Sequence, residues 1–271
     1  MYDSHTHTPL CKHAQGEPRA YVQAAKAAGL QGLVFTDHSP MPAWFDPEVR
    51  MELEELPFYH ALLEQVRVEA GNFYVGIGLE ADYHPGTEYF VKRLLSSYDY
   101  DYIIGSVHYL GAWPFDNPRY AGEFAERDLR EVYRAYFKLV AEAARTGLFH
   151  AIGHLDLPKV MGYRPPEGYA DLAEEALQVI AAEGLALDVN TAGWRKKAAE
   201  IYPSPELLAR AQALKIPVVL GSDAHRPEDV AHRFADAMGI LRSLGYTQAV
   251  VFKAGQPLPY TLAGPGSTSP S

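Results

Sequence analysis

Histidines and carboxylates stand at the ends of short apolar runs in this sequence. The first run ends in His5-Thr-His7, and His13 follows six residues later. Neutral imidazoles joined by a few carboxylates suit Zn, Fe or Mn, whereas Ca and Mg prefer ligand shells made of oxygen. Residues i and i+2 of an extended segment point to the same side, so His5 and His7 can both bind one ion.

The same residue types end further apolar runs along the chain. They are Asp37 with His38, Glu80, His108, His154, Asn190, and Asp223 with His225. A single histidine in such a place is more often a hydrogen-bonded structural residue, but that explanation fails for a series that takes in seven of the eleven histidines. Six or more imidazoles exceed the needs of one tetrahedral site, so a cluster of ions is predicted. The other histidines are assigned structural or surface roles: His60, His84, His150 and His232.

A scaffold must bring the ends of these runs together. The runs are rich in Val, Ile and Leu with little polar alternation, which is typical of parallel strands buried on both faces. The predicted strands are Tyr2–His5, Leu33–Asp37, Tyr74–Glu80, Tyr102–His108, Phe149–His154, Ala186–Asn190, Val218–Asp223 and Ala249–Lys253. Helical patterns separate them, at Pro18–Ala28, Glu52–Ala70, Thr87–Leu95, Phe124–Thr146, Ala170–Glu183, Pro205–Leu214 and Pro227–Leu244.

Strict alternation of strands and helices over roughly 250 residues predicts an α/β fold of the (β/α)-barrel type. The C-terminal ends of all barrel strands point to one rim, so the histidines and carboxylates are expected to meet there. A doubly wound open sheet is the alternative, but no Gly-rich phosphate loop follows the first strand. The last strand carries none of these residues, which allows it to lie outside the barrel. Residues 1–255 are expected to form one domain and residues 256–271 a C-terminal tail.

Composition limits the partners of the chain. A formal charge of −10 argues against a large nucleic-acid surface, which would be basic. It leaves room for one small phosphorylated metabolite, because bound metal ions reverse the local field. The sequence shows neither a signal peptide nor an apolar stretch long enough to span a membrane. The single cysteine, Cys11, cannot form an internal disulfide, which fits a reducing cytoplasm.

Six motifs together resemble the PHP (polymerase and histidinol phosphatase) superfamily of phosphoesterases, and more closely its histidinol-phosphatase branch. They are DSHTHTPLCKH, FTDHS, GLEADY, GSVHYL, GHLDL and SDAH, and they extend from the start of the chain to His225. The resemblance implies a distorted (β/α)7 TIM-like barrel that holds a trinuclear divalent metal cluster of Fe, Zn or Mn. Carried onto this sequence, one ion takes His5, His7, Glu80 and Asp223; a second shares Glu80 and takes His108 and His154; a third takes His13, His38 and His225.

The resemblance further implies a metal-dependent phosphomonoesterase that converts L-histidinol phosphate to L-histidinol and phosphate in histidine biosynthesis. Two alternatives stay open: a PHP phosphoesterase for another small phosphate ester or a nucleotide, and a non-catalytic PHP module stabilised by metal. Our hypothesis is that a hydroxide held between the ions that share Glu80 attacks phosphorus. The leaving alkoxide needs a proton, which Asp223, Asp37 or a metal-held water can supply. Asp37 is equally suited to orient a ligating histidine.

Other residues near the predicted rim are candidates for contact with substrate. Arg195, just past the sixth strand, is the first candidate for the phosphate, and Lys159 and Arg164 come next. A carboxylate is expected for the cationic groups of histidinol phosphate, and the candidates are Asp116, Asp156 and Glu17. Two long aromatic connections, 39–51 and 109–123, follow strand ends and are either substrate lids or packing flaps. A ring from 113–120 would in the first case stack on the imidazole.

Overall fold

Seven parallel strands form one continuous sheet in the computed structural model, which describes residues 1–262. Their order in space follows the chain: β1 (Tyr2–Thr6), β2 (Gly32–His38), β3 (Tyr74–Asp82), β4 (Tyr102–Ser106), β7 (Ala151–Ile152), β8 (Ala186–Asn190) and β9 (Val218–Gly221). The two outer strands meet where β1 ends, because Thr6 and Ala224 form a parallel bridge and the Asp223 amide donates to the His5 carbonyl at 2.8 Å. The sheet is therefore a nearly closed barrel, as predicted, and not an open doubly wound sheet.

Continuous burial explains why these segments are strands. In β2 every residue from Gly32 to Asp37 is buried, so apolar side chains occupy both faces of the strand. Close packing between strands also requires glycine at one position. A Cβ atom on Gly78 in β3 would lie 2.1 Å from the Tyr102 carbonyl oxygen in β4, and no other residue fits there.

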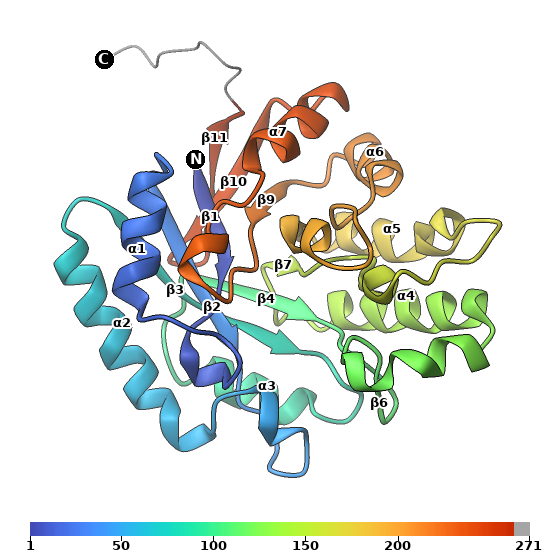
Figure 1. Cartoon of the computed structure of the whole chain (residues 1–271), viewed down its shortest axis with the longest axis horizontal. Coiled ribbons are helices and arrows are strands. Elements are labelled where there is room, and N and C mark those ends of the chain that lie inside the picture. The colour runs from blue at the N-terminus through green and yellow to red at the C-terminus, as the bar shows by residue number, and fades with distance from the viewer. Residues whose placement is uncertain (263–271) are drawn as a thin grey trace.

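Helices cover the outside of the barrel (Figure 1). They are α1 (Pro18–Ala27), α2 (Leu56–Ala70), α3 (Glu88–Leu95), α4 (Leu129–Arg145), α5 (Glu174–Ala182), α6 (Pro205–Ala213) and α7 (Phe234–Ser243). Each predicted helix is present, but α2, α4, α5 and α7 begin later than predicted, because capping and short 3-10 turns precede them. In α4 the Asp128 carboxylate accepts hydrogen bonds from the amides of Arg130 and Glu131, so the helix starts at Leu129 and not at Phe124. None of the described helices is long and apolar enough to cross a membrane.

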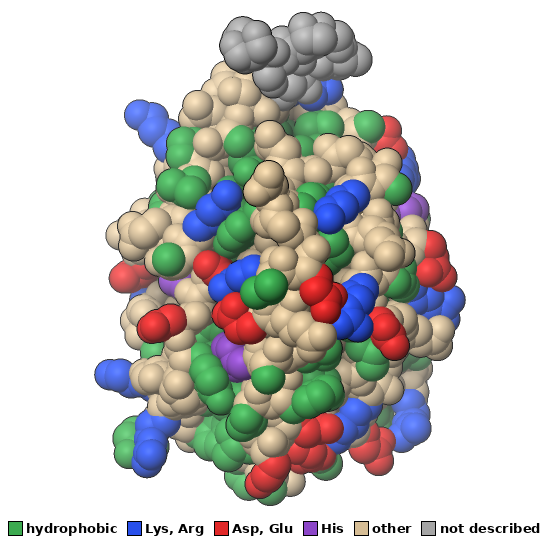
Figure 2. Space-filling model, turned by 90° about the vertical axis from the view of Figure 1, so that its left-hand side faces the viewer, with side chains coloured by type: hydrophobic (Ala, Val, Ile, Leu, Met, Phe, Trp, Pro, Cys, Tyr) green, Lys and Arg blue, Asp and Glu red, His purple; other side chains and the backbone are tan. Residues whose placement is uncertain are grey.

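Short elements complete the connections between strands and helices. The antiparallel pair β5 (Tyr109–Leu110) and β6 (Trp113–Pro114) follows β4. The 3-10 turns are η1 (Pro9–Cys11), η2 (Pro47–Val49), η3 (Leu53–Glu55), η4 (Pro118–Glu126), η5 (Leu157–Met161), η6 (Ala170–Ala173), η7 (Thr191–Arg195) and η8 (Pro227–Asp229). On the face drawn in Figure 2, acidic and basic side chains are interspersed, and histidine side chains are visible between them.

An antiparallel hairpin of β10 (Gln248–Lys253) and β11 (Gln256–Thr261) lies outside the barrel sheet. The prediction that the last strand can leave the barrel is thus confirmed, whereas the predicted tail starts too early, since 256–261 form a strand. The rest of that tail, 263–271, lies outside the described residues. Phe252 stacks on Tyr102 at 5.0 Å, and Lys253 lies over the rings of Tyr2 and Tyr74. These partners begin their strands, so the hairpin covers the N-terminal end of the barrel.

Candidate metal centre

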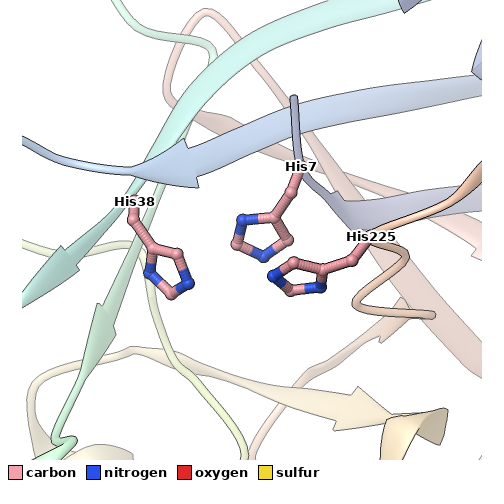
Figure 3. Close-up of side chains that lie close together, drawn as sticks. All are labelled: His7, His38 and His225. Carbon is pink, nitrogen blue, oxygen red and sulfur yellow. The ribbon is translucent and has the colours of Figure 1, made fainter. Parts of the chain in front are cut away.

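The C-terminal ends of the barrel strands carry a dense group of imidazoles and carboxylates. His5 lies in β1 and His7 directly follows it, His38 ends β2, and Glu80 lies near the end of β3. The remaining members follow β4, β7 and β9 by two to four residues: His108, His154, Asp223 and His225. Figure 3 shows that the rings of His7, His38 and His225 lie close together although their strands are distant in sequence. Those of His7 and His225 stack with centroids 4.0 Å apart.

Glu80 occupies the middle of this group. Its side chain is only 1% exposed. One oxygen, Oε1, lies 2.9 Å from His154 Nε2 and 3.5 Å from His108 Nε2. The other, Oε2, lies 3.1 Å from His38 Nδ1, 3.4 Å from His5 Nε2 and 3.6 Å from His7 Nε2. A single carboxylate thus faces two separate sets of imidazoles, one with each oxygen.

The first set is His5, His7, Glu80 and Asp223. The Oδ1 atom of Asp223 lies 3.2 Å from His7 Nε2 and 3.9 Å from His5 Nε2. Neither Nε2 atom has a hydrogen-bond partner among the described residues, although both are buried. Ligand atoms about 2.0–2.1 Å from a tetrahedral zinc ion lie about 3.3 Å from one another, near the lower end of the 3.2–3.9 Å found here. The donors therefore fit a metal ion.

The second set is Glu80, His108 and His154, and its two Nε2 atoms face each other at 3.3 Å. The third set, His13, His38 and His225, is looser. The ring of His13 lies 4.6 Å from that of His225 and 5.3 Å from that of His38. His13 Nδ1 donates to the Cys11 carbonyl, which leaves its Nε2 atom for a ligand, and His225 Nε2 is buried without a partner in the described chain. His38 presents Nδ1 to Glu80 Oε2, the oxygen that also faces His5 and His7, so it lies between the first and third sets.

Carboxylates behind the imidazoles hold them in place. His5 Nδ1 donates to Asp188 at 2.7 Å, and His108 Nδ1 donates to Asp82 at 2.6 Å. Such a bond fixes the tautomer in which Nε2 carries the lone pair that binds metal. Neither Asp82 nor Asp188 was predicted from the sequence. The available signal was spacing, because Asp82 lies two residues after Glu80 and Asp188 two residues before Asn190, on the same faces of their strands.

Asp37 has the position of an orienting residue. It is fully buried behind His7, with Oδ1 3.3 Å from His7 Nδ1 and Oδ2 bonded to the amide and hydroxyl of Thr8. It does not line the cavity at the mouth of the barrel, whereas Asp223 does. Asp223 is also held from behind, because the Asn190 amide donates to its Oδ2 at 3.2 Å.

Mutual charge shifts the pKa values within this group of imidazoles and carboxylates. Burial raises the pKa of Glu80 and Asp223, but the neighbouring imidazoles outweigh it and hold both carboxyls well below their usual range. Burial likewise opposes protonation of His108, yet Asp82 and Glu80 raise its pKa to about 10. In His38 and His225 burial prevails and the pKa lies well below its usual value. Buried Glu80 and partly exposed Asp223 are thus anions that face several imidazoles, and divalent cations can neutralise them.

A cavity of about 520 Å³ opens above the group, and Arg195 and Asp116 are among its lining residues. Arg195, from η7, donates through Nη2 to the carbonyls of Ser222 and Asp223 at 2.8 and 3.0 Å. Its Nη1 atom is buried and has no hydrogen-bond partner within residues 1–262. Asp116 faces the same cavity, and no ion pair or side-chain hydrogen bond to its carboxylate occurs in the described part of the chain.

The other predicted substrate residues lie elsewhere. Lys159 is fully buried, and its ammonium pairs with Asp156 at 2.8 Å and with Glu200 at 2.7 Å. Arg164 donates to the Ala198 carbonyl at 2.7 Å. Asp156 also accepts from the Tyr169 hydroxyl, and Glu17 is exposed at the start of α1. None of these four residues lines the mouth. Lys159 and Asp156 are buried near η5, and Arg164 and Glu17 lie away from the mouth.

The two aromatic connections meet beside the mouth and enclose a further cavity of about 290 Å³, here called the side cavity. Its lining includes Asp46, Arg50, Tyr109, Asp116 and Lys196. Most of the aromatic rings pack into the core, and Phe45, Trp113 and Phe115 are buried. Trp113 and Phe115 therefore do not reach an imidazole in the mouth. Trp44 is 69% exposed and is the large ring of the 39–51 loop that faces solvent.

Most of the chain is similar in sequence to known proteins. The family model described as PHP domain matches residues 3–192. A probable histidinol-phosphatase of Deinococcus radiodurans is 59% identical over 246 residues, which cover 90% of this chain and 94% of that protein. The histidinol-phosphatase of Bacillus subtilis is 30% identical and covers 86% of this chain and 96% of its own length.

A solved structure shows a similar fold. It is the histidinol phosphate phosphatase of Lactococcus lactis subsp. lactis, complexed with Zn, L-histidinol and phosphate. It superposes with a TM-score of 0.80 at 22% sequence identity, over 94% of this chain and 98% of that one. This likeness confirms the predicted TIM-like barrel.

Proposed function

This chain belongs to the PHP domain family, and we propose that it is a metal-dependent histidinol-phosphatase that hydrolyses L-histidinol phosphate to L-histidinol and phosphate. One observation carries the proposal. A chain 59% identical to a probable histidinol-phosphatase, over 90% of its length, gathers imidazoles and the carboxylates of Glu80 and Asp223 at one barrel mouth. The reaction is a step of histidine biosynthesis, which the names of the relatives imply.

The three donor sets support a trinuclear centre of Zn, Fe or Mn as part of this proposal. His5, His7, Glu80 and Asp223 would hold one ion, and Glu80 with His108 and His154 a second. His13 and His225 would hold the third, together with His38. Bound divalent ions supply positive charge for phosphate oxygens and lower the pKa of water.

The chain's own residues bind phosphate and move the proton. The free Nη1–H of Arg195 donates to a phosphate oxygen in the mouth, while its Nη2 stays anchored on the Ser222 and Asp223 carbonyls. Asp223 lines the mouth, so its carboxylate is placed to accept a proton from the attacking water. As the new P–O bond forms and the bond to the alcohol breaks, Asp223 passes that proton to the leaving oxygen. Asp37 lies behind His7, so we propose only an orienting role for it.

Asp116 is suited to recognise the leaving group. Its carboxylate lies where the mouth and the side cavity join, and burial raises its pKa. A partly buried carboxyl without a partner is unfavourable, and a cationic ligand relieves that cost. L-histidinol carries an ammonium and an imidazole, so we propose that one of these groups donates to Asp116 while the phosphate lies at Arg195.

Phosphate release tests the proposal directly. L-Histidinol phosphate is compared with a panel of neutral phosphate monoesters and nucleotides, in metal-stripped protein and after addition of Zn, Mn or Fe. We expect metal-dependent turnover with a preference for histidinol phosphate, and Asp116→Asn should reduce that preference about 10-fold or more while neutral esters react as before. Equal rates on all esters would favour a different small substrate. No turnover of any ester would favour a non-catalytic metal-stabilised module.

A further inference from the structure

Arg50 is a buried cation that contacts a partner of a proposed metal ligand. Its side chain is 4% exposed, and Nη1 lies 2.7 Å from Asp82 Oδ2. The other oxygen of Asp82 accepts from His108 Nδ1 at 2.6 Å. Both oxygens of this carboxylate are therefore occupied, one by Arg50 and one by His108. A buried carboxylate held on both sides cannot rotate without losing a charged hydrogen bond.

The same guanidinium also closes the 39–51 loop. Arg50 Nε donates to the Asp46 carbonyl at 3.1 Å, and Nη1 donates to the Ser39 carbonyl at 3.2 Å. The guanidinium lies over the Phe45 ring, 5.1 Å from its centroid. Asp46 in turn accepts from the Tyr109 hydroxyl, so the loop is joined to the second aromatic connection. The planar fork of arginine makes these contacts together, which a lysine cannot do.

One side chain thus links the metal centre to the wall of the side cavity. Asp46, Arg50 and Tyr109 line that cavity, and His108 lies between it and the mouth. A side chain that served only as packing would not need to donate hydrogen bonds to Asp82 and to the loop carbonyls together. Loss of Arg50 leaves Asp82 a buried carboxylate with one partner, which allows it to rotate and frees His108 to turn.

We infer that Arg50 is a positioning residue that holds Asp82, and through it His108, and couples metal binding to the order of the 39–51 loop. The metal half of this inference rests on the proposed centre, but not on the identity of the phosphate ester. Loss of a residue that holds a metal ligand typically weakens metal affinity about 10–100-fold. Arg50 lies one contact further from the metal, because it holds Asp82, which holds His108. A loss of about 10-fold in zinc affinity is expected when it is removed.

The test uses Arg50→Gln, Arg50→Lys and a matched control, Arg67→Gln. Arg67 also pairs with a carboxylate, Asp101, and donates to a strand carbonyl, Val75, at 2.8 Å, but it belongs to α2 and lines neither cavity. Zinc affinity of the full chain is measured by competition with a chromophoric chelator. Hydrogen exchange of residues 39–51 is measured in metal-stripped protein and with zinc.

We expect zinc to slow exchange of 39–51 in the parent protein, and this protection to be lost in Arg50→Gln together with about 10-fold in zinc affinity. Arg50→Lys, which keeps the charge, should recover part of the affinity but not the loop protection. Arg67→Gln should lower Tm and leave both readouts unchanged. Unaltered zinc affinity and zinc-dependent protection in Arg50→Gln would overturn the inference, and so would equal losses in Arg67→Gln. Failure to hydrolyse histidinol phosphate would refute the proposed function and leave these readouts untouched.

Discussion

Replacing Glu80 by glutamine removes the charge at the centre of the proposed metal site and keeps the shape of the side chain. The carboxylate oxygens lie between 2.9 and 3.6 Å from five imidazole nitrogens. An amide has one acceptor oxygen and an NH2 group that only donates. Glu80→Gln therefore leaves at most one of the two donor sets with an oxygen ligand, and it also places an N–H group where the other set needs a lone pair.

The size of the effect follows from linkage between metal binding and folding. Loss of an outer partner of a ligand weakens metal binding about 10–100-fold, so loss of a ligand is expected to weaken it at least about 100-fold. When metal is in excess, a 100-fold weaker affinity removes about 2.7 kcal/mol of metal-linked stability. In a chain of this size that amounts to roughly 5–10 °C of the Tm increase produced by zinc. Turnover of the phosphate ester should fall by at least about 100-fold.

Three measurements check this prediction: metal content after dialysis, Tm with and without zinc, and phosphate release. Glu200→Gln is the control, because it makes the same substitution in a carboxylate that pairs with Lys159 and Arg164 outside the mouth. The control should lower Tm equally with and without zinc and keep its metal. If Glu80→Gln binds the full metal complement and is stabilised by zinc as strongly as the parent protein, Glu80 is not a ligand and the proposed sharing of two sets is refuted.

Two further predictions concern the mouth and the acid stability of the fold. Arg195→Gln should lower kcat/KM for the phosphate ester about 10²–10³-fold without loss of metal. The reason is that the free Nη1 of Arg195 is expected to bind the negative charge that develops on the phosphate. Steady-state kinetics that match the parent protein would exclude that contact. Burial lowers the pKa of His60 to about 4, and its ring stacks on Tyr98 at 3.7 Å. The folded state thus takes up a proton at lower pH than the unfolded state, so stability is lost as pH falls from about 6.5 to 4, by no more than about 3 kcal/mol. His60→Phe should flatten the dependence of Tm on pH in this window, and an unchanged slope would show that other groups govern it.

The sequence predicts the barrel and the grouping of ligands well for a physical reason. Parallel strands buried on both faces are recognisable as continuous runs rich in Val, Ile and Leu. Their C-terminal ends share one rim, so polar residues at those ends must meet. Asp82 and Asp188 were not predicted because their role depends on which imidazole lies across the sheet from them. His108 Nδ1 reaches Asp82 from the segment after β4, and His5 Nδ1 in β1 reaches Asp188 in β8 across the intervening strand β9.

Buried ion pairs and edge strands were harder to predict. Lys159 follows a strand end, as a phosphate-binding lysine would, but the 3-10 turn Leu157–Met161 turns it inward onto Asp156 and Glu200. In β11 the prolines at 257 and 259 suggest irregular chain, yet a strand that is paired on one side tolerates them. Both differences arise from long-range packing that local sequence does not encode.

The net charge of −10 raises the question of how the protein binds a phosphate anion. The proposed donor sets suggest an answer, because imidazoles ligate without charge and Glu80 and Asp223 are the carboxylates that would face the ions. Two carboxylates neutralise only one divalent ion, so each further ion leaves net positive charge at the mouth. Arg195 adds to that charge from the rim. Metal-stripped protein lacks this added positive charge, so we expect affinity for phosphate to depend on the metal content of the site.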